Sequence, residues 1–460
     1  MTSASRPRVV LYNPRAVFYT MPLALLAVAS ALDRDEVEVV IIDGRLERDP
    51  VRRVLAAAEN ALSVGITVLT GAPIRDALAV SRAVKDRYPS CPVIWGGWHP
   101  SLFAKECVDE KSVDAVVVGQ GEDALREIVT RLRVGERVHG VIGPRSLRDL
   151  NDYPAHDYSL IPVERYFALK GKRQVDYISS QGCRFRCAFC ADPAVYERGW
   201  TGLAPERIAV EAQELKHRHG MTELAFQDET FFTHPRRVEA LSREFLGRDL
   251  SIEWTATLRA DQACRMGDAL FREAVRAGLS RVMVGVEAGS QAMLDRLKKD
   301  LRLDQVLDTA DMCVRHRVGA IFNFIIGFPG EDEASIEATL ALAKRLRRMS
   351  PRFETPIFYY RPYPGNPIAD DARASGYTFP RALDEWANFD YVADRGPWVT
   401  PTRWRQVERF KFYSRHAWQE SSAWRWPLRT AARLRCEHDW YGFPFEKTLV
   451  ELVRPPQQVS

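Results

Sequence analysis

The stretch SQGCRFRCAFC, residues 180–190, decides how this 460-residue chain is interpreted. It sets Cys183, Cys187 and Cys190 in one loop, with three and then two residues between them. Three thiolates at this spacing can converge on three irons of a cubane and leave the fourth iron without a protein ligand, whereas a ferredoxin-type carrier closes all four positions with cysteine. The spacing therefore predicts a [4Fe-4S] cluster whose fourth iron is open to a small molecule.

Two other interpretations of the three cysteines stay open at this point. A structural zinc ion would need a fourth Cys or His at short range, but the next histidine is His217 and the next cysteine is Cys264. Cysteines also pack as small apolar side chains, although Arg184 and Arg186 make this loop polar.

The sequence on both sides of the loop predicts two α/β units. Residues 1–145 alternate β-branched runs with helical patterns, which is typical of a Rossmann-like parallel sheet with crossover helices. After a connector at residues 146–170, residues 171–365 repeat the alternation and predict a partial (β/α)6 barrel with its chemistry at the strand carboxyl ends. The predicted strands are Val9–Tyr12, Val37–Ile42, Val64–Leu69, Val93–Trp95 and Ala115–Val118, followed by Val175–Ser180, Leu224–Gln227, Trp254–Leu258, Arg281–Gly285, Ile321–Ile326 and Pro356–Tyr360.

The last segment, residues 366–460, differs in composition. Seven of the eleven tryptophans lie between Trp386 and Trp440. We expect a C-terminal helical region with aromatic packing, which caps the mouth of the barrel.

The bulk composition narrows the function classes. The chain has 65 basic and 61 acidic side chains and a net charge of +4, which gives no argument for binding nucleic acid or a membrane surface. No apolar run approaches the roughly 20 residues that cross a bilayer, and Met1–Val10 has no apolar signal core. Eight cysteines are too sparse for a disulfide framework. We therefore expect a cytoplasmic protein without nucleic-acid or membrane partners.

The cysteine loop matches the CxxxCxxC signature of the radical S-adenosylmethionine (SAM) superfamily, including Phe189 directly before the last cysteine. The resemblance implies that the three cysteines hold the cluster and that SAM binds the open iron. The reduced cluster would then cleave SAM to methionine and a 5′-deoxyadenosyl radical. Later strand ends also resemble that superfamily. The resemblance implies that Asp228, with Glu229 as second candidate, contacts the SAM amino group and that Arg259 lies near the SAM carboxylate. It also implies that Glu287 lies near the ribose or amino group and that Asn323 belongs to the segment lining the adenine site.

The first unit resembles the cobalamin-binding domain of the B12-domain radical SAM family. The resemblance is carried by Trp95–Ser101 (WGGWHPS) and Val118–Glu122 (VGQGE), whose glycine turns would let the backbone approach a bulky ligand. Methionine-synthase-like domains carry DxHxxG after the first strand, and its histidine ligates cobalt. Here Asn13–Tyr19 has neither a histidine nor an acidic residue. Cobalamin is therefore possible but not favoured, and His99 is expected to be a structural loop histidine.

A deoxyadenosyl radical can abstract hydrogen from an unactivated C–H bond, so we expect the protein to position the substrate and exclude water. Acid–base work would fall to Glu229, His234 or Glu354. Phe358–Asn366, together with Glu354, His234 and the late tryptophans, is expected to bind a polar, cationic, sugar-like molecule by stacking, cation–π contact and charged hydrogen bonds.

The overall layout resembles the radical SAM diol dehydratase of apramycin (aminoglycoside antibiotic) biosynthesis. That resemblance implies a lyase that dehydrates an amino-sugar diol, served by an electron donor such as flavodoxin or ferredoxin and by a partner reductase. A cobalamin-dependent radical SAM C-methyltransferase is the alternative enzyme, and a non-catalytic iron–sulfur protein is the alternative from another class.

Overall fold

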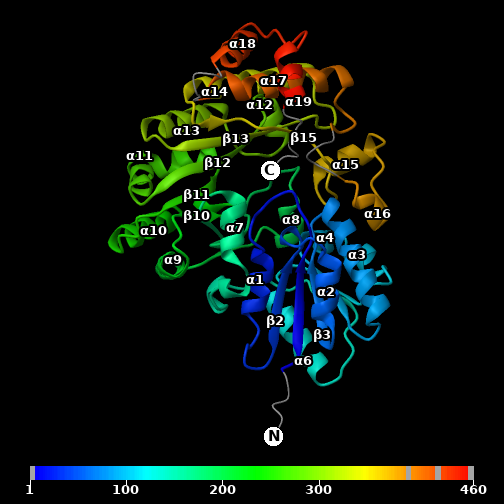
Figure 1. Cartoon of the computed structure of the whole chain (residues 1–460). Helices are drawn as coiled ribbons and strands as arrows, with labels where there is room; N and C mark the ends of the chain where they lie inside the picture. Colours follow the sequence, from blue (N-terminus) through cyan, green and yellow to red (C-terminus); the bar gives the residue numbers. More distant parts are fainter. Residues whose placement is uncertain (1–5, 390–394, 420–425, 454–460) are drawn as a thin grey trace.

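The computed structural model describes residues 6–389, 395–419 and 426–453. Two parallel sheets, each with its own helices, lie one above the other in Figure 1, and a group of C-terminal helices lies at the far end of the second. The fold class expected from the sequence is confirmed: a Rossmann-like domain, a curled half-barrel sheet and C-terminal helices.

The N-terminal sheet has the strand order β2-β1-β3-β4-β5-β6, and every neighbouring pair is parallel. Its strands are apolar runs because both faces are covered: Val10 and Tyr12 of β1 pack on the side of α2 and α3, and Val9 and Leu11 pack on the side of α1 and α6. The elements are β1 Arg8–Asn13, α1 Leu23–Ser30, β2 Glu38–Asp43, α2 Pro50–Ala58, β3 Ala61–Thr67, α3 Ala72–Arg87, β4 Val93–Gly96, α4 Trp98–Leu102, α5 Ala104–Val108, β5 Ala115–Val117, α6 Glu122–Arg133 and β6 Gly140–Ile142.

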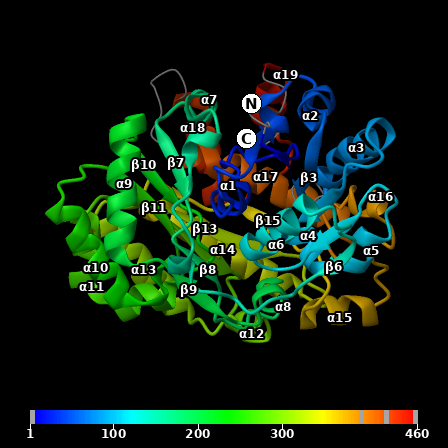
Figure 2. The same ribbon diagram turned by 90° about the horizontal axis from the view of Figure 1, so that it is seen from below.

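The second sheet has the order β14-β13-β12-β11-β10-β7, with β15 also beside β13, and it is parallel throughout. Helices cover its outer face (Figure 2). The elements are α7 Val163–Lys170, β7 Gln174–Tyr177, α9 Pro205–His219, β10 Glu223–Phe226, α10 Pro235–Gly247, β11 Glu253–Leu258, α11 Ala260–Arg276, β12 Leu279–Glu287, α12 Gln291–Arg296, α13 Leu303–Arg315, β13 Gly319–Ile326, α14 Glu333–Met349, β14 Phe353–Glu354 and β15 Ile357–Tyr359.

A short hairpin that the sequence did not predict encloses the cysteine loop. Strand β7 ends at Tyr177, and β8 (Ser180–Gly182) then pairs antiparallel with β9 (Trp200–Gly202). Gly182 has a φ of +87°, and a Cβ there would lie 2.4 Å from the carbonyl oxygen of Gly199. The hairpin can close only with glycine at this position, so the loop between its strands, including α8 (Asp192–Tyr196), is held at both ends.

The C-terminal helices do not cap the barrel mouth as expected. The helices α17 (Pro401–Ala417), α18 (Trp426–Glu437) and α19 (Phe445–Val453) lie against the outside of α14, where Lys344 pairs with Asp439 at 2.7 Å and Arg347 donates to the Ser414 carbonyl. Before them, α15 (Pro367–Ala374) and α16 (Leu383–Trp386) cross back to the N-terminal domain.

The late tryptophans have separate structural positions. Trp386 is 1% exposed in the N-terminal core, with its ring 4.4 Å from that of Phe103, and Trp398 stacks near Tyr360. Trp426 and Trp440 are exposed at the far end, and Trp424 lies outside the described residues. The prediction that these rings form a substrate site is therefore corrected: they pack in different parts of the fold.

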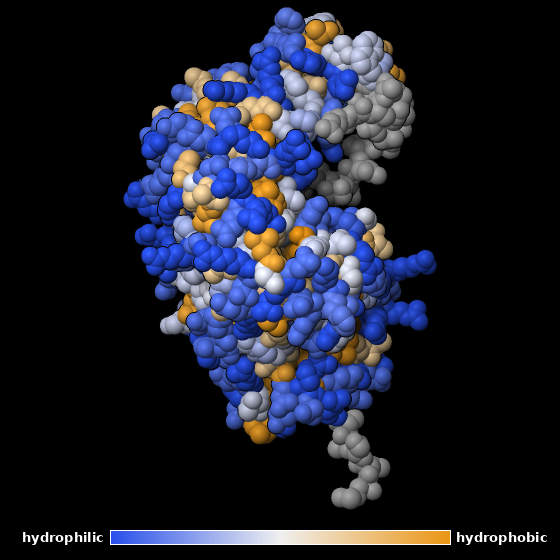
Figure 3. Space-filling model, turned by 90° about the vertical axis from the view of Figure 1, so that its left-hand side faces the viewer, coloured by the Kyte–Doolittle hydropathy of each residue, from blue (hydrophilic) through white to orange (hydrophobic). Residues whose placement is uncertain are grey.

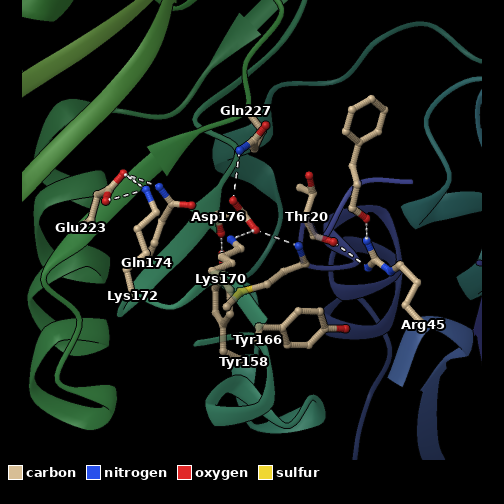
Figure 4. A network of polar contacts seen from close by, with 12 residues as sticks. Thr20, Arg45, Tyr158, Tyr166, Lys170, Lys172, Gln174, Asp176, Glu223 and Gln227 are labelled. Carbon is tan, nitrogen blue, oxygen red and sulfur yellow. Dashed lines mark hydrogen bonds and ion pairs between the residues drawn. The ribbon is translucent and has the colours of Figure 1, made fainter. Parts of the chain in front are cut away.

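A buried network joins the two domains (Figure 4). Asp176 of β7 is 2% exposed, pairs with Lys170 at 2.5 Å, and accepts a hydrogen bond of 2.7 Å from the backbone of Met21, just before α1. On the other side, Arg45 donates to the carbonyl of Thr20 at 2.6 Å. The loop between β1 and α1 is thus fixed from both domains, which sets the position of α1 against the barrel.

Hydrophilic residues cover most of the face in Figure 3, with apolar residues in small groups between them. Among the described residues, no helix is both long and apolar enough to cross a membrane.

Candidate functional site: the cysteine loop and the inter-domain cavity

The three cysteines of the loop, hereafter the cluster cysteines, are all reduced in the structure. The Sγ of Cys187 accepts a hydrogen bond from Arg259 at 3.7 Å, and the Sγ of Cys190 accepts one from the Asp192 backbone at 3.5 Å. Burial raises the pKa of Cys183 to about 11 and that of Cys190 well above its usual range, and the charge of Cys187 raises both further. Burial therefore favours the protonated form of Cys183 and Cys190, which a metal would have to displace on binding.

This donor set fits an iron–sulfur cluster better than a single ion. A cubane takes one cysteine for each of three irons, as the spacing of these cysteines allows, whereas a structural zinc ion would need a fourth Cys or His ligand. Within residues 6–389, 395–419 and 426–453, no three Cys, His, Asp or Glu side chains are arranged to hold one metal ion. The loop is anchored through the Ala188 backbone, which donates to the Leu297 carbonyl at 2.8 Å. That contact brings residues 297–300 beside the cluster cysteines.

Arg259 lies directly beside the cysteine loop, as the sequence predicted. It follows β11, is 6% exposed, and its guanidinium lies 3.7 Å from the centre of the Phe185 ring. Asp261 accepts from Arg259 Nε at 2.9 Å, and the Lys299 carbonyl accepts from Nη2 at 2.5 Å. These contacts hold the positive charge of Arg259 beside Cys187, where it would attract a carboxylate.

Glu287 belongs to the same group, and its partner is a residue that the sequence analysis missed. Lys299 pairs with Glu287 at 2.6 Å, both are about 7% exposed or less, and the Lys299 ammonium lies 5.9 Å from the Phe189 ring. A Cβ at Gly285 would lie 2.5 Å from the Glu287 carboxylate, so a larger residue there would displace this ion pair. Glu287 itself has a φ of +74° at a shift in the β12–β13 register, a strained conformation that turns its side chain toward the loop. No sequence pattern pointed to Lys299.

Asn323 and Asp228 lie on or just after barrel strands, and their predicted roles toward SAM stay predictions. Asn323 lies opposite Gly285 in the register of β12 and β13, and is half-buried. The Asp228 carboxylate is 1% exposed and accepts three hydrogen bonds, from the backbone and hydroxyl of Ser179 and the hydroxyl of Ser180, at 2.6–2.7 Å. Asp228 thereby holds the turn that leads into β8 and the cysteine loop, so its effect on SAM binding would be exerted through that turn.

A cavity of about 310 Å³ lies between the two domains. On the N-terminal side it is lined by α1, by the loops at the carboxyl ends of β3, β4 and β5, and by strand residues between α1 and the sheet. On the other side it is lined by the β7–β8 turn and by α8. The residues used below are Leu11, Gly65, Gly97, Trp98, Gly119, Glu122, Gln181, Tyr196 and Glu229.

The shape of this cavity depends on glycines, and it fits a large ligand. Gly97 and Gly119 have φ values of +94° and +78°, and a Cβ at Gly119 would meet no atom within 4 Å. Gly65 packs so closely on Leu11 that a Cβ would lie 2.8 Å from it. The backbone at Gly119 therefore borders open space, whereas the space beside Gly65 is taken by the Leu11 side chain, which lines the cavity at this point. These are the properties expected of a site for cobalamin.

His99 does not take part in the cavity. It is 0% exposed, its Nδ1 lies 3.0 Å from the Thr70 hydroxyl, and its ring packs against Phe103. Burial lowers the pKa of His99 to about 3. It is a structural histidine of the N-terminal core.

Of the three predicted acid–base residues, the structure brings only Glu229 to the cavity. Burial, followed by the charge of Asp192, raises the pKa of Glu229 to about 8, and burial raises that of Asp192 to about 6. His234 instead packs on Trp200, with ring centres 4.6 Å apart, outside the cavity lining.

Glu354 lies on the opposite edge of the barrel sheet. It belongs to β14, pairs with Arg281 at 2.7 Å, and is more than half exposed. Its register partner is Ile321, near the amino end of β13, whereas the site lies at the carboxyl ends. This position argues against the acid–base role predicted for Glu354.

Two family models match this chain, one over the cysteine loop and the barrel sheet and the other over the N-terminal domain. Residues 177–343 match the Radical SAM superfamily, and residues 11–129 match the B12 binding domain. The chain therefore carries a radical SAM domain preceded by a B12-binding domain, and SAM and a [4Fe-4S] cluster are its supported cofactors.

The chain is similar to an uncharacterized methyltransferase of Pyrococcus horikoshii, with 29% identity over 399 residues, 82% of this chain and 84% of that protein. It is also similar to cytidylyl-2-hydroxyethylphosphonate methyltransferase of Streptomyces wedmorensis, with 23% identity, 81% of this chain and 83% of the other.

Two solved structures share the fold. The cobalamin-dependent SAM radical enzyme OxsB, with aqua-cobalamin and SAM bound, has a TM-score of 0.69 and 15% identity, covering 99% of this chain and 74% of that one. The radical SAM methyltransferase TsrM from Kitasatospora setae, with cobalamin and a [4Fe-4S] cluster bound, has a TM-score of 0.70 and 14% identity, covering 94% and 99%.

Proposed function

We propose that this protein is a cobalamin-dependent radical SAM methyltransferase acting on a small molecule. The observation that carries the proposal is the cavity between the glycine-rich edge of the N-terminal sheet and the turn that leads into the cysteine loop. The two methyltransferase relatives support it. The preference for diol dehydration rested on the overall layout, including the missing histidine in Asn13–Tyr19, and the cavity does not depend on a histidine there.

The chain's own residues have separate tasks in this proposal. The cluster cysteines would hold the [4Fe-4S] cluster, with Arg259 and the Glu287–Lys299 pair beside it to orient SAM. Gly97, Gly119 and the α1 wall would hold cobalamin. When bound, the cluster supplies an electron for cleaving SAM, and cobalamin supplies a carrier for the methyl group. The apolar lining from Leu11 to α1 would keep water away from that part of the site.

The proposal is tested by following the methyl group. The anaerobically reconstituted enzyme would be incubated with methyl-labelled SAM, reductant and a metabolite extract, with and without hydroxocobalamin. We expect label in a small-molecule product and formation of S-adenosylhomocysteine, both dependent on cobalamin. Formation of 5′-deoxyadenosine without label transfer and without a need for cobalamin would refute the proposal and favour dehydration. An electron donor such as flavodoxin or ferredoxin belongs to the same proposal and can replace the chemical reductant in this assay.

A further inference from the structure

One end of the inter-domain cavity is built differently from the rest. Aliphatic side chains and glycines form much of its lining, and Arg207 and Glu211 form an ion pair in another part of it. Next to α8 the wall consists of Trp98 and Glu122 from the N-terminal domain, and of Tyr196 and Glu229 from the barrel side. The rings of Trp98 and Tyr196 lie 5.9 Å apart at an angle of 48°. Two carboxyl groups and two aromatic rings from both domains therefore surround the same end of the cavity.

Neither carboxyl group is in direct contact with a cation among the described residues, although the charge of Arg126 acts on Glu122 from a distance. Glu122 is 6% exposed, and Glu229 is also buried. Within the described parts of the chain neither forms an ion pair, and the nearby carboxylate of Asp192 adds negative charge. The donors that reach Glu229 are backbone N–H groups, including that of Gly182. Buried carboxyl groups are normally paired; without a partner, burial favours their neutral form, and a cation bound beside them would favour the carboxylate.

Tyr196 lies at the centre of this arrangement. The charges of Glu229, Asp192 and Glu122 all act on its hydroxyl and, after burial, raise its pKa. The hydroxyl accepts a hydrogen bond from Gln181 at 3.4 Å, and Gln181 in turn accepts one from Gln120 at 3.2 Å. This chain of amides fixes the Tyr196 ring across the domain boundary.

We propose that this end of the cavity binds the substrate through a cationic nitrogen, held between the carboxyl of Glu229 and the rings of Trp98 and Tyr196. Aromatic faces attract a cation electrostatically, and a carboxylate adds a charge-assisted hydrogen bond. The inference rests on the proposed function, because it places the amine-bearing substrate beside the turn that leads into the cysteine loop. The cationic substrate expected from the sequence is retained, but its binding groups differ from the late tryptophans and Glu354.

Benzylamine and benzyl alcohol are suitable probes, since they have nearly the same size and differ at neutral pH by one positive charge. Binding to the cluster-reconstituted, hydroxocobalamin-loaded full chain would be measured by calorimetry. We expect benzylamine to bind about tenfold more tightly than benzyl alcohol, a preference reduced to less than about twofold in Glu229→Gln. Trp98→Leu should weaken benzylamine more than benzyl alcohol, and Glu354→Gln, a carboxylate change at the far edge, should leave both affinities unchanged.

Equal affinities in the wild-type protein, or an unchanged preference in Glu229→Gln, would overturn the inference. The inference also fails if Glu229→Gln loses hydroxocobalamin while its cluster remains, because the carboxyl would then contact the cofactor. A wild-type protein that prefers benzylamine but never binds hydroxocobalamin would refute the proposed function and leave the cation site standing.

Discussion

Replacing Asp228 tests whether this carboxylate acts on SAM directly or through the turn before the cysteine loop. Asp228→Ala would leave the Ser179 backbone N–H and two serine hydroxyls without their acceptor in a fully buried place. Each buried donor left unsatisfied costs about 1–3 kcal/mol, and rotation of the hydroxyls reduces their share. We therefore expect a loss of roughly 3–6 kcal/mol in the free energy of unfolding, a large part of the about 5–15 kcal/mol typical of a native protein.

We expect the losses of stability, iron and SAM binding to be smaller in Asp228→Asn than in Asp228→Ala. Asp228→Asn keeps an acceptor for the Ser179 N–H and should cost only about 1–2 kcal/mol. Iron bound after reconstitution should fall from wild type to Asn to Ala, and SAM binding, measured by equilibrium dialysis, should fall in proportion to the iron. Urea unfolding followed by circular dichroism gives the stability, with Asp311→Ala on the exposed face of α13 as a control expected within about 0.5 kcal/mol of wild type. If Asp228→Ala keeps full iron and stability but loses SAM affinity, the carboxylate contacts SAM and the reasoning is wrong.

Three further predictions concern the site. Changing any cluster cysteine to alanine should remove the bound [4Fe-4S] cluster, measured as iron and visible absorbance, whereas Cys313→Ala, deep in the barrel core, should keep it. Burial raises the pKa of Glu229 from 4.5 to about 8, so the folded state binds the carboxyl proton more tightly than the unfolded state does. The contribution of this proton to the unfolding free energy is complete below about pH 4.5 and is lost as the pH rises through about 8. The unfolding free energy should thus fall over that range by up to about 5 kcal/mol, and Glu229→Gln should flatten the fall; parallel curves for both proteins would contradict the assignment. Gly119→Val, whose side chain would enter the cavity, should lower hydroxocobalamin binding at least about tenfold without loss of iron, and unchanged cobalamin binding would show that the ligand lies elsewhere.

The sequence predicted the long parallel strands of the two sheets and missed the shortest strands. Parallel strands buried on both faces leave long apolar runs, so β1 and β12 were found close to their true bounds. The hairpin of β8 and β9 is only three residues on each side, and its alternation is too short to detect. The strand β6 (Gly140–Ile142) was missed for the same reason.

The site was predictable where residue type alone carries the chemistry. The cysteine spacing and Arg259 needed no three-dimensional information to be chosen. Lys299 was missed because its role depends on a loop brought to the cysteines by one backbone contact with Ala188. Glu354 was chosen because it lies next to a predicted strand. Its position near the amino end of the sheet follows from the pairing of β14 with β13, which the local sequence does not reveal.

The path of the chain through α16 bears on how the protein is made. Leu383, Trp386 and Phe389 complete the core that covers one face of the N-terminal sheet, beside Val64 and Ile74. During synthesis the ribosome must therefore finish the whole barrel before this core can close. An N-terminal fragment released early would leave an apolar surface uncovered and become a client for chaperones. Expression of this domain alone should accordingly need the α16 segment supplied in trans or fused behind it.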